Sequence, residues 1–196
     1  SVLDNGIGMS RNDLELSIKR HATSKIKTQE DLERISTYGF RGEALASITS
    51  VSNIEIRTRL QSDSHGWRLV SEPMKNPTIE PFNQAIGTQV FVRNLFFNVP
   101  ARRKFLKSKL TEIRYISDTL IRFALANPDK RFTYYDEDTL VFDVHPSTLL
   151  ERIAKLLGND AKDGFLPIEY KNELMQITGF IGLPKFARPS NSGQYL

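Results

Sequence analysis

The sequence predicts a mixed α+β sandwich. Apolar and polar residues alternate over residues 53–60, as they do in a half-buried strand. Apolar residues three and four apart over residues 113–123 indicate an amphipathic helix. Strands and helices come in blocks, with hairpins between neighbouring strands, and this order favours the α+β class.

The individual elements follow in order along the chain. A helix begins after Ser10, because this capping residue is followed three positions on by Asp13. Pro73, Pro77 and Pro81 argue against a regular central strand in their segment. The predicted strands are residues 2–3, 53–60, 67–69, 88–95, 131–136, 139–144, 164–170 and 173–181. The predicted helices are residues 10–20, 31–35, 45–51, 113–127 and 149–157, with a further one beginning at Pro100 and a linker and cap at 145–147.

Composition excludes several classes of protein. The 196 residues contain no cysteine, so disulfides, thiolate metal sites and thiol catalysis are excluded. No apolar run approaches the ~20 residues that span a bilayer, so we expect no membrane span. The three histidines are scattered and predict no metal site. The net charge of +4 weakly favours an anionic partner.

The first candidate motif is Asp4-x-Gly6-x-Gly8. A carboxylate at the end of a strand can accept a hydrogen bond from the exocyclic amine of adenine. The neighbouring glycines let the backbone approach a flat ring. The alternative is an Asn-Gly hairpin turn beside an ordinary surface carboxylate. Thr88, which follows Gly87 at the start of a strand, can add a hydroxyl to a base-binding pocket.

The second motif, residues 39–45, reads GFRGEAL and opens a helix. Unpaired N–H groups at a helix start bind phosphate, and the two glycines let a phosphate chain lie against the backbone. The alternative is a glycine-containing loop and a capped helix, in which Glu43 complements the helix dipole. No G-x-x-x-x-G-K-[ST] motif occurs, which excludes a P-loop NTPase.

Two further segments carry charge or hydroxyl groups. Residues 21–27, which include Lys25, form a polar loop that is either a phosphate-binding lid or a solvated loop. From Arg93 to Lys109 there are six basic residues and no acidic one. This run can contact DNA phosphates, but a solvated helix face is the alternative.

Taken together and in this order, the motifs resemble the N-terminal ATPase region of the MutL family of DNA mismatch repair proteins. That family belongs to the GHKL class, shared with gyrase B, the Hsp90 chaperones and histidine kinases. DNGIGM at residues 4–9 resembles the adenine-binding motif of the whole class. The narrower matches to the family are RHATSKI at 20–26, GFRGEALASI at 39–48, LFFNVPARRKFL at 95–106 and GFIGLP at 179–184.

The resemblance implies a role for each matched residue. Asp4, Gly6, Gly8 and Thr88 surround adenine, and the phosphate and lid residues are Lys25, Arg41, Gly42, Glu43, Ala44 and Leu45. Arg102, Arg103 and Lys104 lie near a DNA-facing surface. The resemblance also implies a partial GHKL domain over residues 1–145, with a mixed sheet and helices on one face of it. The start of a ribosomal S5 domain 2-like domain follows over residues 146–196, with a boundary near residue 146.

The resemblance also implies what the intact protein does. It binds and hydrolyses ATP with Mg²⁺, which switches homodimerisation and couples MutS-type mismatch recognition on DNA to a downstream endonuclease or helicase. The location is the cytoplasm in a bacterium or the nucleus in a eukaryote.

The catalytic groups of the family find no match here. Its general-base Glu and Mg²⁺-binding Asn lie upstream of the matched aspartate, and its phosphate-binding Lys lies beyond residue 196. We therefore expect the chain to be a fragment that is inactive alone, with no catalytic or metal-binding residue of its own. The competing hypotheses are a non-catalytic basic DNA-binding module and another GHKL ATPase such as a histidine kinase.

Overall fold

The computed structural model describes residues 1–22, 39, 41–158, 164–186 and 194–195. These residues form two compact units, Ser1–Leu106 and Lys107–Leu196. The predicted helix at 31–35 and the predicted lid residue Lys25 lie outside the described residues. None of the described helices has the length and apolar character needed to cross a membrane.

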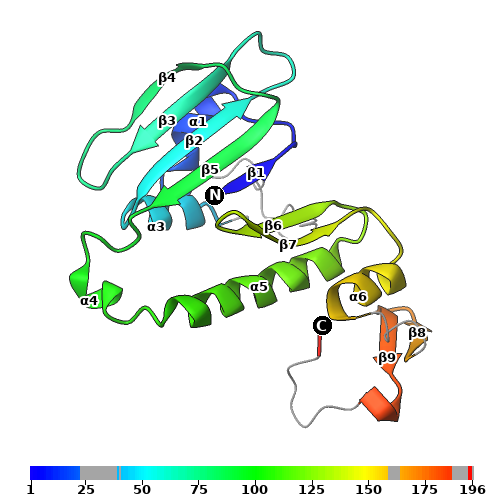
Figure 1. Ribbon diagram of the computed structural model, residues 1–196. Helices are drawn as coiled ribbons and strands as arrows, with labels where there is room; N and C mark the ends of the chain where they lie inside the picture. Colours follow the sequence, from blue (N-terminus) through cyan, green and yellow to red (C-terminus); the bar gives the residue numbers. More distant parts are fainter. Residues whose placement is uncertain (23–38, 40, 159–163, 187–193, 196) are drawn as a thin grey trace. The chain divides into compact units, whose positions relative to one another are not determined.

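A five-stranded sheet with the order β1-β5-β2-β3-β4 forms the framework of the first unit (Figure 1). Its strands are β1 (Val2–Asp4), β2 (Asn53–Arg59), β3 (Gly66–Ser71), β4 (Thr78–Phe82) and β5 (Gly87–Arg93). Each neighbouring pair among these strands is antiparallel, so the parallel pairing expected of a mixed sheet does not occur among them. The α+β class itself is confirmed.

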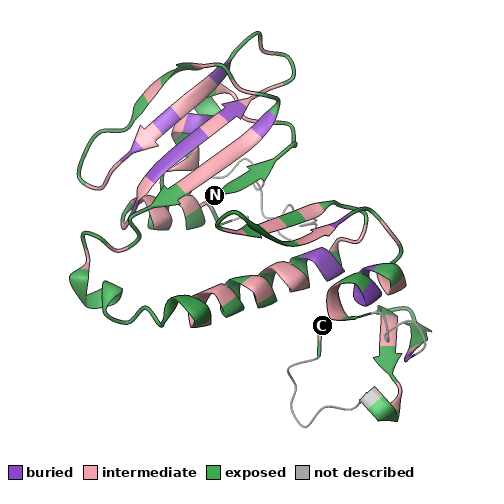
Figure 2. Cartoon of the chain, in the orientation of Figure 1, coloured by how far each residue is buried: buried purple, intermediate pink, exposed green. Residues whose placement is uncertain are grey.

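Two helices cover one face of this sheet, α1 (Arg11–Ser17) and α3 (Ala44–Thr49). Helix α1 begins where the sequence predicts, because the Ser10 side chain accepts a hydrogen bond from the Asp13 N–H at 3.1 Å. The core consists of Leu14, Ile54, Ile56 and Leu69, with Ile18 of α1 and Leu45 and Ile48 of α3 packed against it. Figure 2 shows this buried stripe along the central strands. A short helix, α4 (Pro100–Arg103), starts at the predicted proline.

The proline-rich segment becomes a strand only at the edge of the sheet. Pro81 lies in β4 and pairs with Trp67 of β3, and β4 has no second neighbour in the described sheet. An edge strand tolerates proline because one side of its backbone needs no ladder hydrogen bond. The prediction that prolines exclude a central strand here is confirmed.

The second unit joins two helices and two hairpins. Its elements are α5 (Lys109–Ala126), β6 (Phe132–Asp136), β7 (Thr139–Val144), α6 (Leu149–Leu157), β8 (Phe165–Lys171), β9 (Gln176–Gly182) and a 3₁₀ turn (Pro184–Phe186). Helix α6 starts with a capping box, in which Thr148 and Glu151 each bond the backbone of the other. The cap is thus Thr148, one residue after the predicted linker and cap at 145–147.

The border between the compact units does not fall near residue 146. Helix α6 shares a core with α5, because Ile153 and Ala154 pack against Leu125. This contact keeps α5, both hairpins and α6 in one unit that starts at Lys107. The family assignment of residues 1–145 and 146–196 to two domains stays a prediction.

Candidate nucleotide-binding site

Asp4 ends the first strand and lies opposite Thr88 in the antiparallel β1–β5 pair. Its Oδ1 accepts hydrogen bonds from the Gly6 N–H at 2.9 Å and from the Thr88 N–H at 3.2 Å. The first bond is an Asx turn, which folds the chain back directly after the strand. Within the described residues, the structure gives Oδ2 of this exposed carboxylate no hydrogen-bond partner. The carboxylate is therefore held through one of its two oxygens.

Gly8 brings the loop after Asp4 against the end of β2. It has a φ of +75°, and a Cβ at this position would lie 2.0 Å from the Arg59 carbonyl oxygen. A larger residue therefore clashes with backbone that cannot move without breaking the sheet. The last residue of the predicted motif, Gly8, must therefore be glycine for a steric reason.

Thr58 is a member of this cluster that the sequence analysis missed. It is fully buried, and its Oγ1 accepts a hydrogen bond from the Met9 N–H at 2.9 Å. The same hydroxyl lies 3.1 Å from the Gly87 carbonyl oxygen and 3.1 Å from Thr88 Oγ1. The available signal was weak: a threonine at a core-facing position of an alternating strand, where isoleucine stands at the two preceding core-facing positions.

The second predicted motif starts helix α3. Gly42 has a φ of +63°, and a Cβ there would lie 2.4 Å from the Ala22 carbonyl oxygen. The His21 N–H donates to the Gly42 carbonyl at 3.1 Å, so the chain after α1 lies against this glycine. Glu43 is the N-cap residue but makes no side-chain capping bond. Its Oε1 lies instead 3.6 Å from His21 Nδ1.

Both predicted motifs belong to the same face of the sheet. Thr58 lies directly opposite Thr88, and Asp4 lies directly opposite Thr88 on the other side, so these three side chains share one face. Ile54 and Ile56 of the core project from β2 on that face, and helix α3 packs on them. Ala44 and Leu45 form the first turn of α3, and the exposed Arg41 precedes it.

The predicted DNA-facing residues Arg102, Arg103 and Lys104 are exposed at helix α4 and its C-cap. The Arg102 guanidinium stacks on the Phe96 ring, 4.4 Å from its centroid. The Phe96 N–H donates to the Val51 carbonyl at 2.7 Å, so the loop before α4 is bonded to the segment after α3. The basic residues are thus displayed on a fixed loop.

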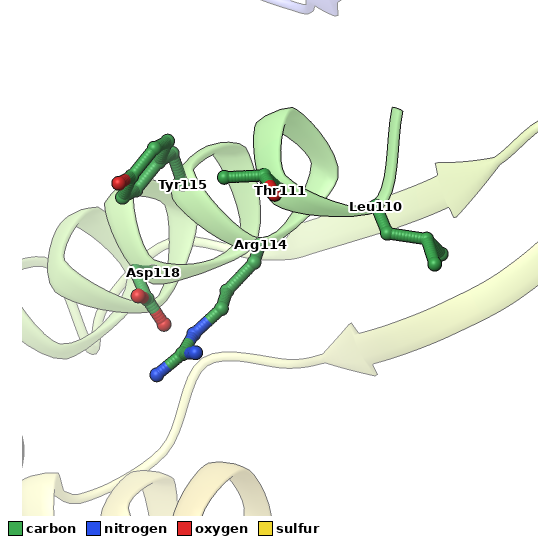
Figure 3. A pocket seen from close by; sticks show the side chains of 5 residues that line it. All are labelled: Leu110, Thr111, Arg114, Tyr115 and Asp118. Carbon is green, nitrogen blue, oxygen red and sulfur yellow. The ribbon is translucent and has the colours of Figure 1, made fainter. Parts of the chain in front are cut away.

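One shallow hollow lies outside this cluster, on α5. Figure 3 shows its lining, in which every side chain comes from that helix: Leu110, Thr111, Arg114, Tyr115 and Asp118. It contains none of the predicted site residues. Among the described residues, no group of three acidic or histidine side chains could hold a metal ion.

Comparison with known proteins first identifies the class. Residues 1–80 match the family model described as "Histidine kinase-, DNA gyrase B-, and HSP90-like ATPase". The matched stretch contains β1, α1, α3, β2 and β3, and therefore both glycine motifs. The first unit has the fold of this ATPase class.

Longer matches then identify the family within the class. The chain is 45% identical over 196 residues to the DNA mismatch repair protein MutL of Symbiobacterium thermophilum, which covers 99% of this chain and 31% of the relative. It is 46% identical over 200 residues to MutL of Beijerinckia indica, covering 100% of this chain and 31% of the relative. The chain matches the N-terminal ATPase region of the MutL family over nearly all of its residues. It spans about a third of the length of these curated relatives.

Solved structures agree with this assignment. The Aquifex aeolicus MutL ATPase domain complexed with ADP matches with a TM-score of 0.64 and 30% identity, over 86% of this chain and 58% of that chain. The N-terminal domain of a DNA repair protein matches with a TM-score of 0.75 over 97% of this chain and 60% of that chain. At 22% identity, this second likeness shows the fold alone. The predicted family and fold class are confirmed.

Proposed function

We propose that this chain binds the adenine of ATP at Asp4 and Thr88 and serves ATP hydrolysis in a MutL-type mismatch repair protein. The observation that carries the proposal is the pairing of Asp4 with Thr88, which occupies one carboxylate oxygen and leaves the other to accept from an adenine amine. Gly6 and Gly8 shape the turn beside that oxygen. The relative that resembles this chain and was solved with ADP supports a nucleotide ligand.

In this proposal the phosphates of ATP bind at the second motif, residues 39–45. Gly42 gives the chain a close approach to the start of α3, and the side chain of Glu43 leaves the first-turn N–H groups uncapped. We assign Gly42, Glu43, Ala44 and Leu45 to the phosphate-binding start, with Arg41 beside them. Lys25 belongs to the lid in this proposal.

We assign neither hydrolysis nor Mg²⁺ binding to a residue of this chain. Glu43 faces His21 and is not assigned as the general base. The Glu, Asn and Lys that the family uses have no match within the 196 residues, so these residues alone should not hydrolyse ATP. In the complete gene product, Mg²⁺ would neutralise charge on the triphosphate. ATP binding would then switch homodimerisation and coordinate a MutS-type protein with an endonuclease or helicase, in the cytoplasm of a bacterium.

Substitution of Asp4 by Asn tests the adenine site. An asparagine can keep the bonds to Gly6 and Thr88 through its oxygen, but its NH₂ group then meets the adenine amine donor to donor. We expect ATP–Mg²⁺ to bind the complete gene product at least about tenfold more weakly, measured by isothermal titration. Asp63→Asn, in the turn between β2 and β3, is the matched control and should bind as the wild type does. Equal affinity of Asp4→Asn and wild type would refute the adenine role.

A second proposed role is DNA binding by the basic residues of α4. Exposure of Arg102, Arg103 and Lys104 on a loop fixed by backbone bonds favours it. Replacing both arginines by glutamine should flatten the plot of log affinity against log salt by about 0.9 for each DNA phosphate that is no longer neutralised. Lys75→Gln, which removes an exposed lysine that pairs with Glu72, is the control. An identical salt slope in the double variant would remove these arginines from the DNA contact surface.

A further inference from the structure

The buried hydroxyl of Thr58 has more partners around it than it has protons. A threonine hydroxyl carries one proton and can accept two hydrogen bonds. The Met9 N–H occupies one acceptor site at 2.9 Å. The Gly87 carbonyl oxygen and Thr88 Oγ1 both lie at 3.1 Å. How the single proton is shared therefore decides what Thr88 can do.

The chemistry of these partners assigns the proton. A carbonyl oxygen only accepts, so Thr58 must be the donor in its bond to Gly87. Either oxygen could be the donor in the 3.1 Å contact between the two threonine hydroxyls. With the Thr58 proton given to Gly87, the direction that completes all the contacts of Thr58 is from Thr88 to Thr58. Thr88 then has no proton left for a ligand, and its oxygen presents lone pairs alone.

Asp4 presents the same chemistry beside it. Its Oδ1 is taken by the backbone N–H groups of Gly6 and Thr88, and an ionised carboxylate has no proton to donate. The strand register places the Asp4 and Thr88 side chains directly opposite each other on one face. Asp4 and Thr88 thus form a pair of neighbouring side-chain acceptors on one face of the sheet.

We propose that Thr58 is a specificity-determining positioning residue, which fixes Thr88 as a hydrogen-bond acceptor and thereby selects a purine with a 6-amino group over one with a 6-oxo group. The inference rests on the proposed function, since it needs a purine bound beside Asp4. An amino group offers protons to both acceptors. A 6-oxo group turns lone pairs toward them, and a hydroxyl that is free to rotate could relieve this repulsion, but Thr88 is not free.

The test compares ATP with inosine triphosphate, which differs in carrying oxygen in place of the 6-amino group. Isothermal titration of the complete gene product gives the ratio of the two dissociation constants. Wild type should favour ATP. Thr58→Val keeps the side-chain volume but frees the Thr88 proton to donate to a 6-oxo group, so the ratio should shrink about tenfold. Thr58→Ser keeps the hydroxyl and should restore the wild-type ratio.

A second variant keeps the test independent of how well Thr58→Val folds. Thr88→Val removes the same acceptor without touching the buried hydroxyl, and it should also shrink the ratio. A purely structural role for Thr58 would weaken both nucleotides equally and leave the ratio unchanged. An unchanged ratio of dissociation constants in Thr58→Val overturns the inference. A ratio that shrinks in Thr58→Ser as well also overturns it. In both cases ATP binding by the wild type still stands. Failure of the wild type to bind either nucleotide overturns the proposed function and this inference with it.

Discussion

Among the described residues, each unit buries one charged side chain, and the two charges are balanced in different ways. Glu55, in β2 of the first unit, receives hydrogen bonds from three arginines, Arg57 and Arg68 at 2.8 Å and Arg93 at 3.1 Å. Arg152, in α6 of the second unit, is fully buried and bonds no carboxylate among the described residues. Its guanidinium donates to four backbone carbonyls, those of Ala124, Pro128, Lys130 and His145.

The difference shows that a buried charged group can form its hydrogen bonds either with side chains or with the backbone. The Glu55 carboxylate gathers arginines on the sheet face opposite the helices, and the Arg57 guanidinium lies between the rings of Phe82 and Phe91. Arg152 instead satisfies carbonyls at the end of α5, in the following turn and after β7. The first network holds arginine side chains on the surface of the sheet. The second provides hydrogen-bond donors to buried backbone carbonyls from three segments of the second unit.

The two charges also differ in how they respond to pH. Burial by itself raises the pKa of Glu55, but the hydrogen bonds from Arg68, Arg57 and Arg93 outweigh it and lower this pKa from 4.5 to about 2. Burial lowers the pKa of Arg152, against the raising effect of Asp129. An arginine nevertheless keeps its proton at any ordinary pH. Only the Glu55 network should therefore respond to mild acid.

Replacing Arg152 by Met should have the largest effect on stability. Methionine fills much of the volume but leaves four carbonyl oxygens without their donor, and each buried acceptor left unpaired is costly. We expect the second unit to lose about 3–5 kcal/mol of unfolding free energy, measured by urea denaturation and by amide exchange over α5 and α6. Lys155→Met, an exposed position of the same helix, should change it by less than about 0.5 kcal/mol. Similar losses in both variants would show that the four carbonyls do not depend on Arg152.

Replacing Glu55 by Gln should have a smaller effect that depends on pH. Because its folded pKa lies below its unfolded value, the carboxylate stabilises the fold above about pH 4.5, and this contribution is lost as the pH falls toward 2. The shift corresponds to about 3 kcal/mol at pH 7. The stability gap between wild type and variant, followed by urea denaturation, should narrow by more than half at pH 3.

Glu80→Gln provides the control for Glu55 and the smallest expected effect. Glu80 accepts a single bond from Arg68 at 2.8 Å, and its side chain is 57% exposed. An exposed ion pair contributes about 0–1 kcal/mol, so this variant should stay close to wild type at both pH values. The loss of unfolding free energy in Glu55→Gln should exceed the loss in Glu80→Gln and should shrink in acid. If either expectation fails, the three arginines do not depend on Glu55.

Much of the fold followed from local patterns. The alternation over residues 53–60 predicted β2, the Ser10–Asp13 spacing predicted the start of α1, and α6 has the predicted bounds, residues 149–157. The border of the compact units at Lys107 was not evident from local patterns, because the packing of Ile153 and Ala154 on Leu125 links segments that look separate along the chain. Helix α1 ends at Ser17 with Ile18 as its C-cap, and not near residue 20, since helix ends are the part of a helix that local patterns define least well.

The candidate site was predictable in its motifs but incomplete in its residues. Asp4, Gly8 and Gly42 were recognisable because a turn, a close approach and a positive φ leave few choices of residue. Thr58 was not, since threonine in a strand is ordinary until its neighbours are known. Likewise, the sequence showed Glu55 and Arg57 as the polar face of a strand and held no sign that Arg68 and Arg93 share the same carboxylate.

The sequence by itself determined the elements, the two glycine motifs and the family, because caps, periodicity and turn residues act over a few positions of chain. The tertiary structure decided the strand order, the border between the units and the contact between the Thr58 and Thr88 hydroxyls. These depend on contacts such as Thr58 with Met9, 49 residues away, and with Thr88, 30 residues away. Such pairs meet only after the sheet register is set, and no short-range pattern encodes which side chains will then face each other.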